Sequence, residues 1–368
     1  MKKRLIKNID WSVLVCTILL LAIGLFAIYS ANLNSNEDEF TKQIIWISIS
    51  VPFMILCTII DYDTIAKISP IMYGIMIISL VGVLFTTPIS GATSWFTLGS
   101  FSIQPSEFAK IVTILFLAVV ISRMKQKGGK REMNRITRML LLFLVIGVPL
   151  ALIAKQPDLG TALAFITAFV LMLYTAGLNK WYIIIGITLV IIAVPLLYFF
   201  VLPEHAKTRI DVFLNPDLDP RGAGYNLTQS KLAIGAGELF GMGYLKGNQT
   251  QLGFLYPKST DFIFSVIGEE LGFLVAAAII ILYVVLITKA ITISKTAKDE
   301  LGSLIAIGIA GTFLFHMTEN IGMTVGLLPI TGVPLPFVSY GGSSLLSNLI
   351  MIALLLNISG RRQKSIFM

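Results

Sequence analysis

The chain has 368 residues, of which 56% are hydrophobic and only 13% are charged, and its mean hydropathy is +0.86. Because a soluble domain usually carries about 25% charged residues, this composition excludes an ordinary soluble globular protein. The net charge of +8 does not indicate a nucleic-acid partner, since the basic residues gather in short segments between apolar runs, where the positive-inside rule places them.

Long apolar runs recur along the chain, and a run of about 20 residues is enough to cross a hydrocarbon core of about 30 Å. We therefore predict an all-α polytopic integral membrane protein with about ten transmembrane helices. The first run has no cleavage site and is too long for a signal-peptide core, so we expect it to be the first span. The expected spans cover about residues 11–31, 43–60, 68–86, 107–122, 139–154, 161–177, 181–202, 262–287, 303–325 and 344–358.

The charges between the spans predict the orientation of the protein. The N-terminal MKKRLIK, the stretch 123–138, the loop 289–298 and the tail GRRQK are basic, whereas the loop NLNSNEDEFTK is acidic. Ten spans place every basic segment on one side of the membrane, so we expect both termini in the cytoplasm. Residues 1–368 then form a single membrane domain, with a large outer loop at 203–260 between the seventh and eighth helices.

Unusual polar residues gather on the expected outer side. Glu107 and Lys110 begin the fourth span, Lys155 and Asp158 lie between the fifth and sixth, and a Pro/Gly-rich stretch at 326–343 follows the ninth. Charges at membrane depth are costly unless they are paired or functional, and irregular backbone is tolerated there only inside protein or around a wet cavity. We therefore predict a polar cavity that opens to the outer surface.

Asp261 begins the eighth span, in the stretch STDFIFSVIGEELGF. Partial desolvation makes a carboxylate a stronger base, so Asp261 is a candidate catalytic base, and a helix N-cap is the alternative. Glu269 and Glu270 lie about two turns deeper, and they either belong to the site or form buried structural hydrogen bonds.

Helical spacing predicts two further arrangements. Glu107 and Lys110 are three positions apart and therefore pair on one helix face, either as a structural salt bridge or as part of the site. Asp158, in the motif QPDLGT, is placed to cap the sixth span near its positive end.

The outer loop 203–260 is too long for a passive connection. Its glycines, mixed with Phe, Tyr and Leu, predict an amphipathic helix at the interface and a substrate-binding lid or groove, and an ordinary structured loop is the alternative.

His205 and His316 have no metal-ligand spacing, and no Walker loop, GxSxG elbow or HExxH motif is present. These absences argue against an ATP-driven pump and against a serine or zinc hydrolase.

Six motifs follow one another along almost the whole chain: GATSWFTLGSFSIQPSEFAK, QPDLGT, RIDVFLNP, GYNLTQSKLAIGAGELFGMG, STDFIFSVIGEELG and NIGMTVGLLPITGVPLPFVSYGGSS. Together they resemble the SEDS family (shape, elongation, division and sporulation), which includes the RodA and FtsW proteins of bacterial cell-wall synthesis. GYNLTQSKLAIGAG and GNQTQLGFLYPKSTDF favour the RodA branch, which serves side-wall elongation. Lys258, Ala236 and Glu238 depart from the family pattern and alter the charge of the outer loop.

This resemblance implies a peptidoglycan glycosyltransferase of the bacterial cytoplasmic membrane. It would polymerise lipid II, a disaccharide-pentapeptide on undecaprenyl diphosphate, into β-1,4-linked glycan strands at the outer face. The essential aspartate of the family corresponds to Asp261. The residues expected to bind substrate or support the site are Glu107, Lys110, Asp158, Arg209, Gln229, Lys231, Glu269, Glu270, Asn320 and Ser339.

The resemblance also implies partners and leaves alternatives open. A class B penicillin-binding transpeptidase is the expected protein partner, with a contact near the eighth and ninth spans. The leaving diphosphate needs positive charge, for which Arg209, Lys110 or a divalent cation (Mg or Mn) are candidates; no other cofactor is expected. The rival hypotheses are a lipid II flippase and a non-catalytic scaffold for the penicillin-binding protein.

Overall fold

The computed structural model describes most of the chain. The expected span at 181–202 lies mostly outside the described residues, and Arg209, His205 and residues 1–7 and 363–368 lie outside them. The described residues are 8–34, 38–88, 93–99, 101–182, 184–186, 188, 192, 199, 207, 211–220 and 222–362.

Nine long helices make up most of the described structure. They are α2 Trp11–Asn32, α3 Glu39–Ile59, α5 Ser69–Val83, α6 Pro105–Met133, α7 Ile136–Lys155, α8 Leu159–Ala176, α13 Ile263–Thr296, α14 Glu300–Thr324 and α15 Gly342–Arg361. Eight are long and apolar enough to cross a membrane, and α5 is a shorter apolar helix. They occupy nine of the ten expected spans, so the all-α polytopic fold is confirmed.

Shorter elements connect the long helices. They are α4 Tyr62–Lys67, β1 Phe96–Leu98, β2 Phe101–Ile103, η1 Pro216–Leu218, α11 Ala223–Ala236 and α12 Asn248–Gln251. The strands β1 and β2 form an antiparallel hairpin in which Phe96 pairs with Ile103. The hairpin was not expected from the sequence.

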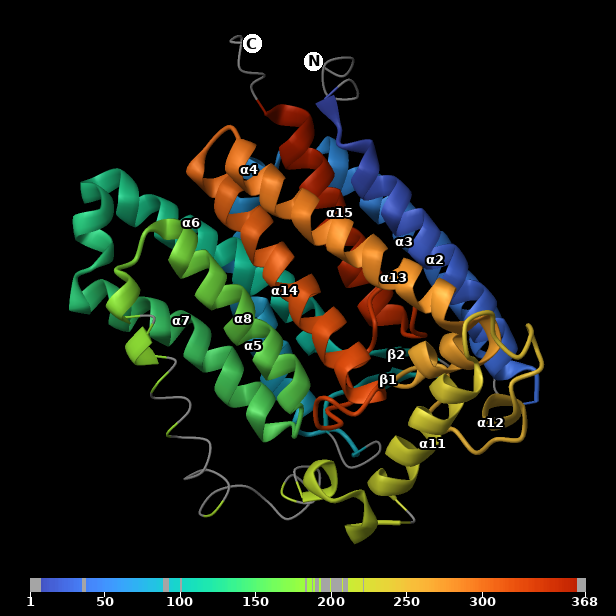
Figure 1. The fold of residues 1–368 in the computed structure, drawn as a ribbon. Coiled ribbons are helices and arrows are strands. Elements are labelled where there is room, and N and C mark those ends of the chain that lie inside the picture. The colour runs from blue at the N-terminus through green and yellow to red at the C-terminus, as the bar shows by residue number, and fades with distance from the viewer. Residues whose placement is uncertain are drawn as a thin grey trace.

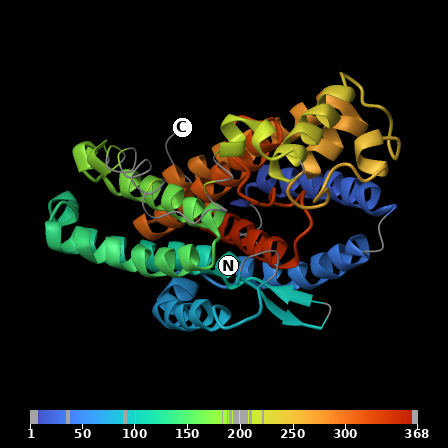
Figure 2. The same cartoon turned by 90° about the horizontal axis from the view of Figure 1, so that it is seen from below.

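The long helices stand side by side, and the two ends of the bundle differ (Figure 1). One end carries the start of α2 and the end of α15, and we call it the termini end. The other carries the β1–β2 hairpin, α11, α12 and Asp261, and we call it the Asp261 end. Figure 2 shows α11 and α12 on one side of the bundle and the hairpin on the other.

Helix α15 is the interior helix of the bundle. In its apolar window, 89% of the residues are buried, and it packs against α3, α6 and α14. Its polar side chains have partners inside the protein. Asn357 Nδ2 donates to the Cys57 carbonyl at 2.7 Å, and Ser347 Oγ donates to Glu107 Oε2 at 2.9 Å. Because buried polar groups need partners, these side chains fix α15 in one rotation and depth.

Helix α13 is broken at Gly272, which has a φ of 78°. The backbone groups freed by the break pair with the segment 238–243. Phe273 N donates to Glu238 O at 2.9 Å, and Leu274 N donates to Leu239 O at 3.3 Å. In return, Met242 N donates to Glu269 O at 2.9 Å, and Gly243 N donates to Glu270 O at 3.1 Å. The segment 238–243 of the expected outer loop therefore supplies hydrogen bonds to a broken membrane helix.

Replacing Gly237 by Ala should destabilise the contact between this loop and α13. A Cβ at Gly237 would lie 1.8 Å from the Gly268 carbonyl oxygen, so backbone must move, at a cost of about 1–3 kcal/mol. Thermal unfolding in detergent should show a lower midpoint for Gly237→Ala. Gly235→Ala is the matched control, because a Cβ there meets nothing within 4 Å. Equal midpoints for the two variants would contradict the close approach.

Candidate functional site

Asp261 lies at the end of the outer loop, immediately before α13. The N-cap residue of α13 is Phe262, with no side-chain cap hydrogen bond, so Asp261 is not the N-cap that the sequence left as an alternative. Asp261 is partly exposed, whereas the residues that follow it, from Phe262 to Glu270, are all buried. The aspartate therefore stands at the boundary between the packed bundle and the surface.

Asn320 of α14 and Ser339 of the 326–341 segment, which follows α14, hold the backbone around Asp261 in place. Asn320 Nδ2 donates to the Asp261 carbonyl at 3.0 Å and to the Val333 carbonyl at 2.8 Å. Ser339 Oγ donates to the Thr260 carbonyl at 2.6 Å and accepts from Leu335 N at 2.8 Å. Asn320 and Ser339, both expected from the resemblance, thus act on the backbone around Asp261.

The Asp261 carboxylate faces the backbone of Gly332. A Cβ on Gly332 would lie 3.4 Å from Asp261 Oδ2, and a φ of 72° favours glycine at this position. The next residue, Val333, packs against the first turn of α8, since a Cβ on Gly160 would lie 2.1 Å from Val333 Cγ2. The start of α8, the 326–341 segment and Asp261 therefore meet at one place.

Asp158 is the N-cap of α8, as expected from the QPDLGT motif. Its Oδ1 accepts from Thr161 N at 3.1 Å, and its Oδ2 accepts from Gln104 Nε2 at 2.9 Å. Gln104 N in turn donates to Ser343 Oγ at 3.0 Å, at the start of α15. Burial raises the pKa of the Asp158 carboxyl, against the hydrogen bonds from Thr161. Asp158 therefore joins α8 to the hairpin and α15 beside the candidate site.

Glu107 and Lys110 form the expected pair, and both are buried. Lys110 Nζ lies 3.0 Å from Glu107 Oε1 and 2.9 Å from Glu107 Oε2. It also lies 2.9 Å from His316 Nε2, and His316 Nδ1 lies 3.2 Å from the Pro334 carbonyl. Because the ammonium group only donates and the carbonyl only accepts, Nε2 of His316 must accept and Nδ1 must carry the hydrogen. A directed chain of hydrogen bonds thus connects α6 to the 326–341 segment.

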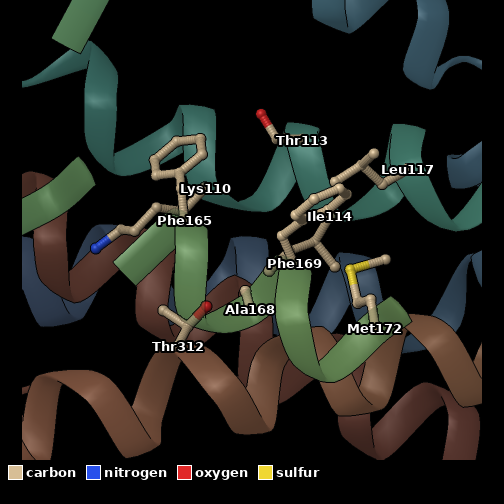
Figure 3. Close-up of a pocket in the computed structure, with 9 residues that line it drawn as sticks. All are labelled: Lys110, Thr113, Ile114, Leu117, Phe165, Ala168, Phe169, Met172 and Thr312. Carbon is tan, nitrogen blue, oxygen red and sulfur yellow. The ribbon is translucent and has the colours of Figure 1, made fainter. Parts of the chain in front are cut away.

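A small hollow lies between α6, α8 and α14, with Lys110 in its wall (Figure 3). Its wall is mostly apolar and includes the rings of Phe165 and Phe169. Since the Lys110 side chain is only 1% exposed, the geometry favours a supporting role for it over contact with a diphosphate.

Glu269 and Glu270 hold the outer loop rather than facing Asp261. Glu269 accepts from Gln249 N at 2.6 Å and from Thr250 N at 3.0 Å, at the start of α12. Glu270 accepts from Ser30 Oγ at 2.7 Å and from Gln251 Nε2 at 2.9 Å. Of the two roles that the sequence left open, buried structural hydrogen bonding describes these two carboxylates best.

Two further expected residues, Gln229 and Lys231, lie on α11, which packs against α13 and α14. Gln229 is half-buried and Lys231 is exposed. A Cβ on Gly326 would lie 2.5 Å from Lys231 Nζ, so the ammonium group lies just beyond the end of α14. A cation at a helix C-terminus is favourable, and this one also stands beside the 326–341 segment.

Lys258 lies three residues before Asp261. Its Nζ donates to the Thr250 carbonyl at 3.1 Å. Burial lowers the pKa of Lys258, and the charges of Glu39 and Glu270 oppose this effect.

Within the described residues, no group of three or more His, Cys, Asp or Glu side chains is placed to hold a metal ion. The described part of the chain therefore gives no support to a protein-bound divalent cation.

His316, Glu319 and Thr331 are residues that sequence reasoning did not assign to the site. Glu319 Oε1 accepts from Thr331 Oγ1 at 2.8 Å, one residue before Gly332. The sequence pattern that could have indicated them is the spacing of His316, Glu319 and Asn320. This spacing places three polar groups on one face of an apolar helix.

Ser339→Ala should slow the reaction without unfolding the protein. The variant loses the hydrogen bond to the Thr260 carbonyl and the hydrogen bond from Leu335 N, each worth about 1 kcal/mol, so Asp261 becomes less well positioned. In the glycan-strand synthesis that the resemblance implies, we expect a lower kcat with little change in KM. Ser48→Ala is the control, since Ser48 is an exposed residue bonded within α3. Equal kcat values for both variants would contradict the positioning role.

The fold and the site define a class: a polytopic membrane protein with a carboxylate held at one end of its helix bundle by an irregular segment. The chain matches the family described as cell cycle protein, with FtsW, RodA and SpoVE as its named members, over residues 10–364. It belongs to this family.

Relatives and solved structures agree with this assignment. The chain is 32% identical to the peptidoglycan glycosyltransferase RodA of Treponema pallidum, covering 98% of this chain and 100% of the relative. It is 35% identical to the peptidoglycan glycosyltransferase MrdB of Escherichia coli, covering 92% and 90%.

Two solved structures share the fold. A structure described as the structural coordination of polymerization and crosslinking by a peptidoglycan synthase complex matches with a TM-score of 0.82 and 26% identity, covering 95% of this chain and 97% of that chain. The crystal structure of the Thermus thermophilus rod shape determining protein RodA matches with a TM-score of 0.72 and 24% identity, covering 97% and 98%.

Proposed function

We propose that this chain is a peptidoglycan glycosyltransferase that polymerises lipid II into β-1,4-linked glycan strands during cell elongation. The observation that carries the proposal is the placement of Asp261, whose carboxylate faces Gly332 while its backbone is fixed by Asn320. Relatives of this chain over nearly its full length are named peptidoglycan glycosyltransferases. The chain acts as a single membrane domain, and residues 203–260 form its outer loop.

Asp261 is the general base of the proposed reaction. It removes the proton from the 4-hydroxyl of the acceptor sugar, and this oxygen attacks the anomeric carbon of the donor's muramic sugar. The bond from that carbon to the diphosphate breaks, and undecaprenyl diphosphate leaves with the electron pair. An α-linked donor and a β-linked product require one inversion, which needs a base but no enzyme nucleophile.

The leaving diphosphate requires positive charge near the site. Lys231 is exposed beside the 326–341 segment, whereas Lys110 is buried with Glu107 and His316. Among the described cations we therefore assign the diphosphate contact to Lys231. Arg209 is a second candidate from the resemblance, and it lies outside the described residues. Lys110 with Glu107 instead supports the backbone of the site through His316.

The Asp261 end of the bundle is the outer face in this proposal. Both termini then lie in the cytoplasm of the bacterial cell, where the basic segments contact the anionic inner leaflet. The expected protein partner is a class B penicillin-binding transpeptidase that meets α13 and α14. The related solved complex, which couples polymerization with crosslinking, supports a partner of this kind.

Strand synthesis from purified lipid II in detergent tests the function, with and without the cognate penicillin-binding protein. Polymer that depends on this chain supports the glycosyltransferase. The flippase hypothesis would take first place if no polymer forms with the partner present while the chain moves lipid II across liposome membranes. A scaffold would stimulate the partner's crosslinking while no variant of an outer carboxylate has an effect.

A further inference from the structure

The outer loop carries a group of exposed apolar side chains where it crosses the broken helix α13. Leu239 is 56% exposed and Phe240 is 79% exposed, and Met242 and Tyr244 are each more than a third exposed. A soluble surface rarely presents so many large apolar side chains together. We call Leu239, Phe240, Met242 and Tyr244 the loop patch.

The loop patch continues into the lipid-facing surfaces of two membrane helices. Tyr244 packs edge-on against Phe26 of α2, with ring centroids 6.1 Å apart, and its hydroxyl donates to the Phe26 carbonyl at 3.1 Å. Phe273 and Leu274 of α13, whose backbone pairs with the loop, are 60% and 53% exposed. The patch and the two helices therefore present one apolar surface.

The depth of this surface follows from an ion pair at the termini end. Helices α2 and α13 pack along each other, and Lys289 Nζ of α13 lies 3.7 Å from Asp10 Oδ2 at the start of α2. Phe26 follows Asp10 by 16 positions, and Phe273 precedes Lys289 by 16 positions. At 1.5 Å per residue, both phenylalanines lie at most about 24 Å from the ion pair along the membrane normal. With the ion pair placed at one boundary of a hydrocarbon core of about 30 Å, this level falls inside the core.

The backbone of the loop patch is partly paired within the protein. Irregular backbone at membrane depth needs partners within the protein. Four hydrogen bonds join 238–243 to α13, and Gly241 N donates to the Gly237 carbonyl at 2.7 Å. Glu238 and Lys246 flank the loop patch, and their long side chains can extend toward the headgroup layer.

We propose that the loop patch is inserted into the hydrocarbon of the outer leaflet. The outer loop is then an anchor that enters the membrane from the Asp261 end and places the neighbouring site against the leaflet surface. Its partner is the acyl-chain region of the bilayer. The proposal concerns the depth of a surface and does not depend on the reaction that the site performs.

A spin-label measurement tests the depth directly. Phe240→Cys and, independently, Leu239→Cys are made in a Cys16→Ala, Cys57→Ala background, labelled with a nitroxide and reconstituted in phosphatidylethanolamine–phosphatidylglycerol liposomes at low protein density. Collisions with oxygen and with a water-soluble nickel chelate are compared. Ile281→Cys, on the exposed face of α13, is the lipid control, and Asp217→Cys, on η1 in the outer loop, is the water control.

We expect the oxygen-to-nickel ratio at positions 239 and 240 to match the ratio at position 281 and to exceed that at position 217 several-fold. A ratio equal to that at position 217 would overturn the proposal, because the patch would then lie in water. Immobile labels that neither reagent reaches would also overturn it, since protein would then cover the patch. An unchanged thermal unfolding midpoint for each labelled protein ensures that depth is measured on the native fold.

Discussion

Asp261→Asn should abolish strand synthesis while lipid II binding and the fold are retained. The amide has nearly the same shape as the carboxylate, and the hydrogen bond from Asn320 reaches the backbone carbonyl, which the substitution leaves in place. The amide cannot take up the proton of the acceptor hydroxyl. Loss of a general base usually costs about 10²–10⁴ in rate, so polymer formation should fall by at least about 100-fold.

The measurement compares initial rates of polymerisation and the binding of labelled lipid II for the two proteins. Asp217→Asn is the matched control, because Asp217 is an exposed aspartate of the same outer loop. It should polymerise at the parent rate. A rate for Asp261→Asn within a few-fold of the parent would exclude Asp261 as the base, and the assignment of the site would fail with it.

Breaking the buried pair of Glu107 and Lys110 should have the second large effect. Glu107→Leu leaves the Lys110 ammonium group buried with only His316 and no opposite charge, which costs about 3–5 kcal/mol. The single variant should unfold at a clearly lower temperature. In the double variant Glu107→Leu/Lys110→Met, no buried charge remains, so most of this stability should return.

The double variant also separates stability from positioning. Removing Lys110 takes away the donor to His316 Nε2, and His316 holds the Pro334 carbonyl. Losing a buried hydrogen bond of this kind is worth about 1–3 kcal/mol, so polymerisation should fall about tenfold in a protein of nearly parental thermal stability. A double variant that is stable and fully active would restrict the pair to a structural role.

The sequence was sufficient to predict the spans and several contacts. Long apolar runs determine the helices because the bilayer sets their length, and nine of the ten runs are helices in the described residues. Local spacing was also informative. The pairing of Glu107 with Lys110 and the capping of α8 by Asp158 both follow from positions three residues apart.

Contacts between distant segments could not be predicted in the same way. The break of α13 lies inside an apolar run, and Gly272 alone does not reveal that residues 238–243 pair with its backbone. The partners of Glu269, Glu270 and His316 come from other helices and loops, so the sequence left their roles open. Hydropathy predicts which segments are buried, whereas the side chains that meet depend on how the helices are packed.

The burial of α15 has a consequence for biogenesis. This helix follows the other described long helices in the chain, yet it lies inside the bundle, and its Asn348, Asn357 and several serines are buried. Such a segment gains little from lipid alone, because Asn357 and Ser347 find partners on α3 and α6, which precede it in the chain. The earlier spans must therefore leave room for α15 until it is made. A chain whose synthesis stalls before this 20-residue helix would expose a partly polar interior to lipid.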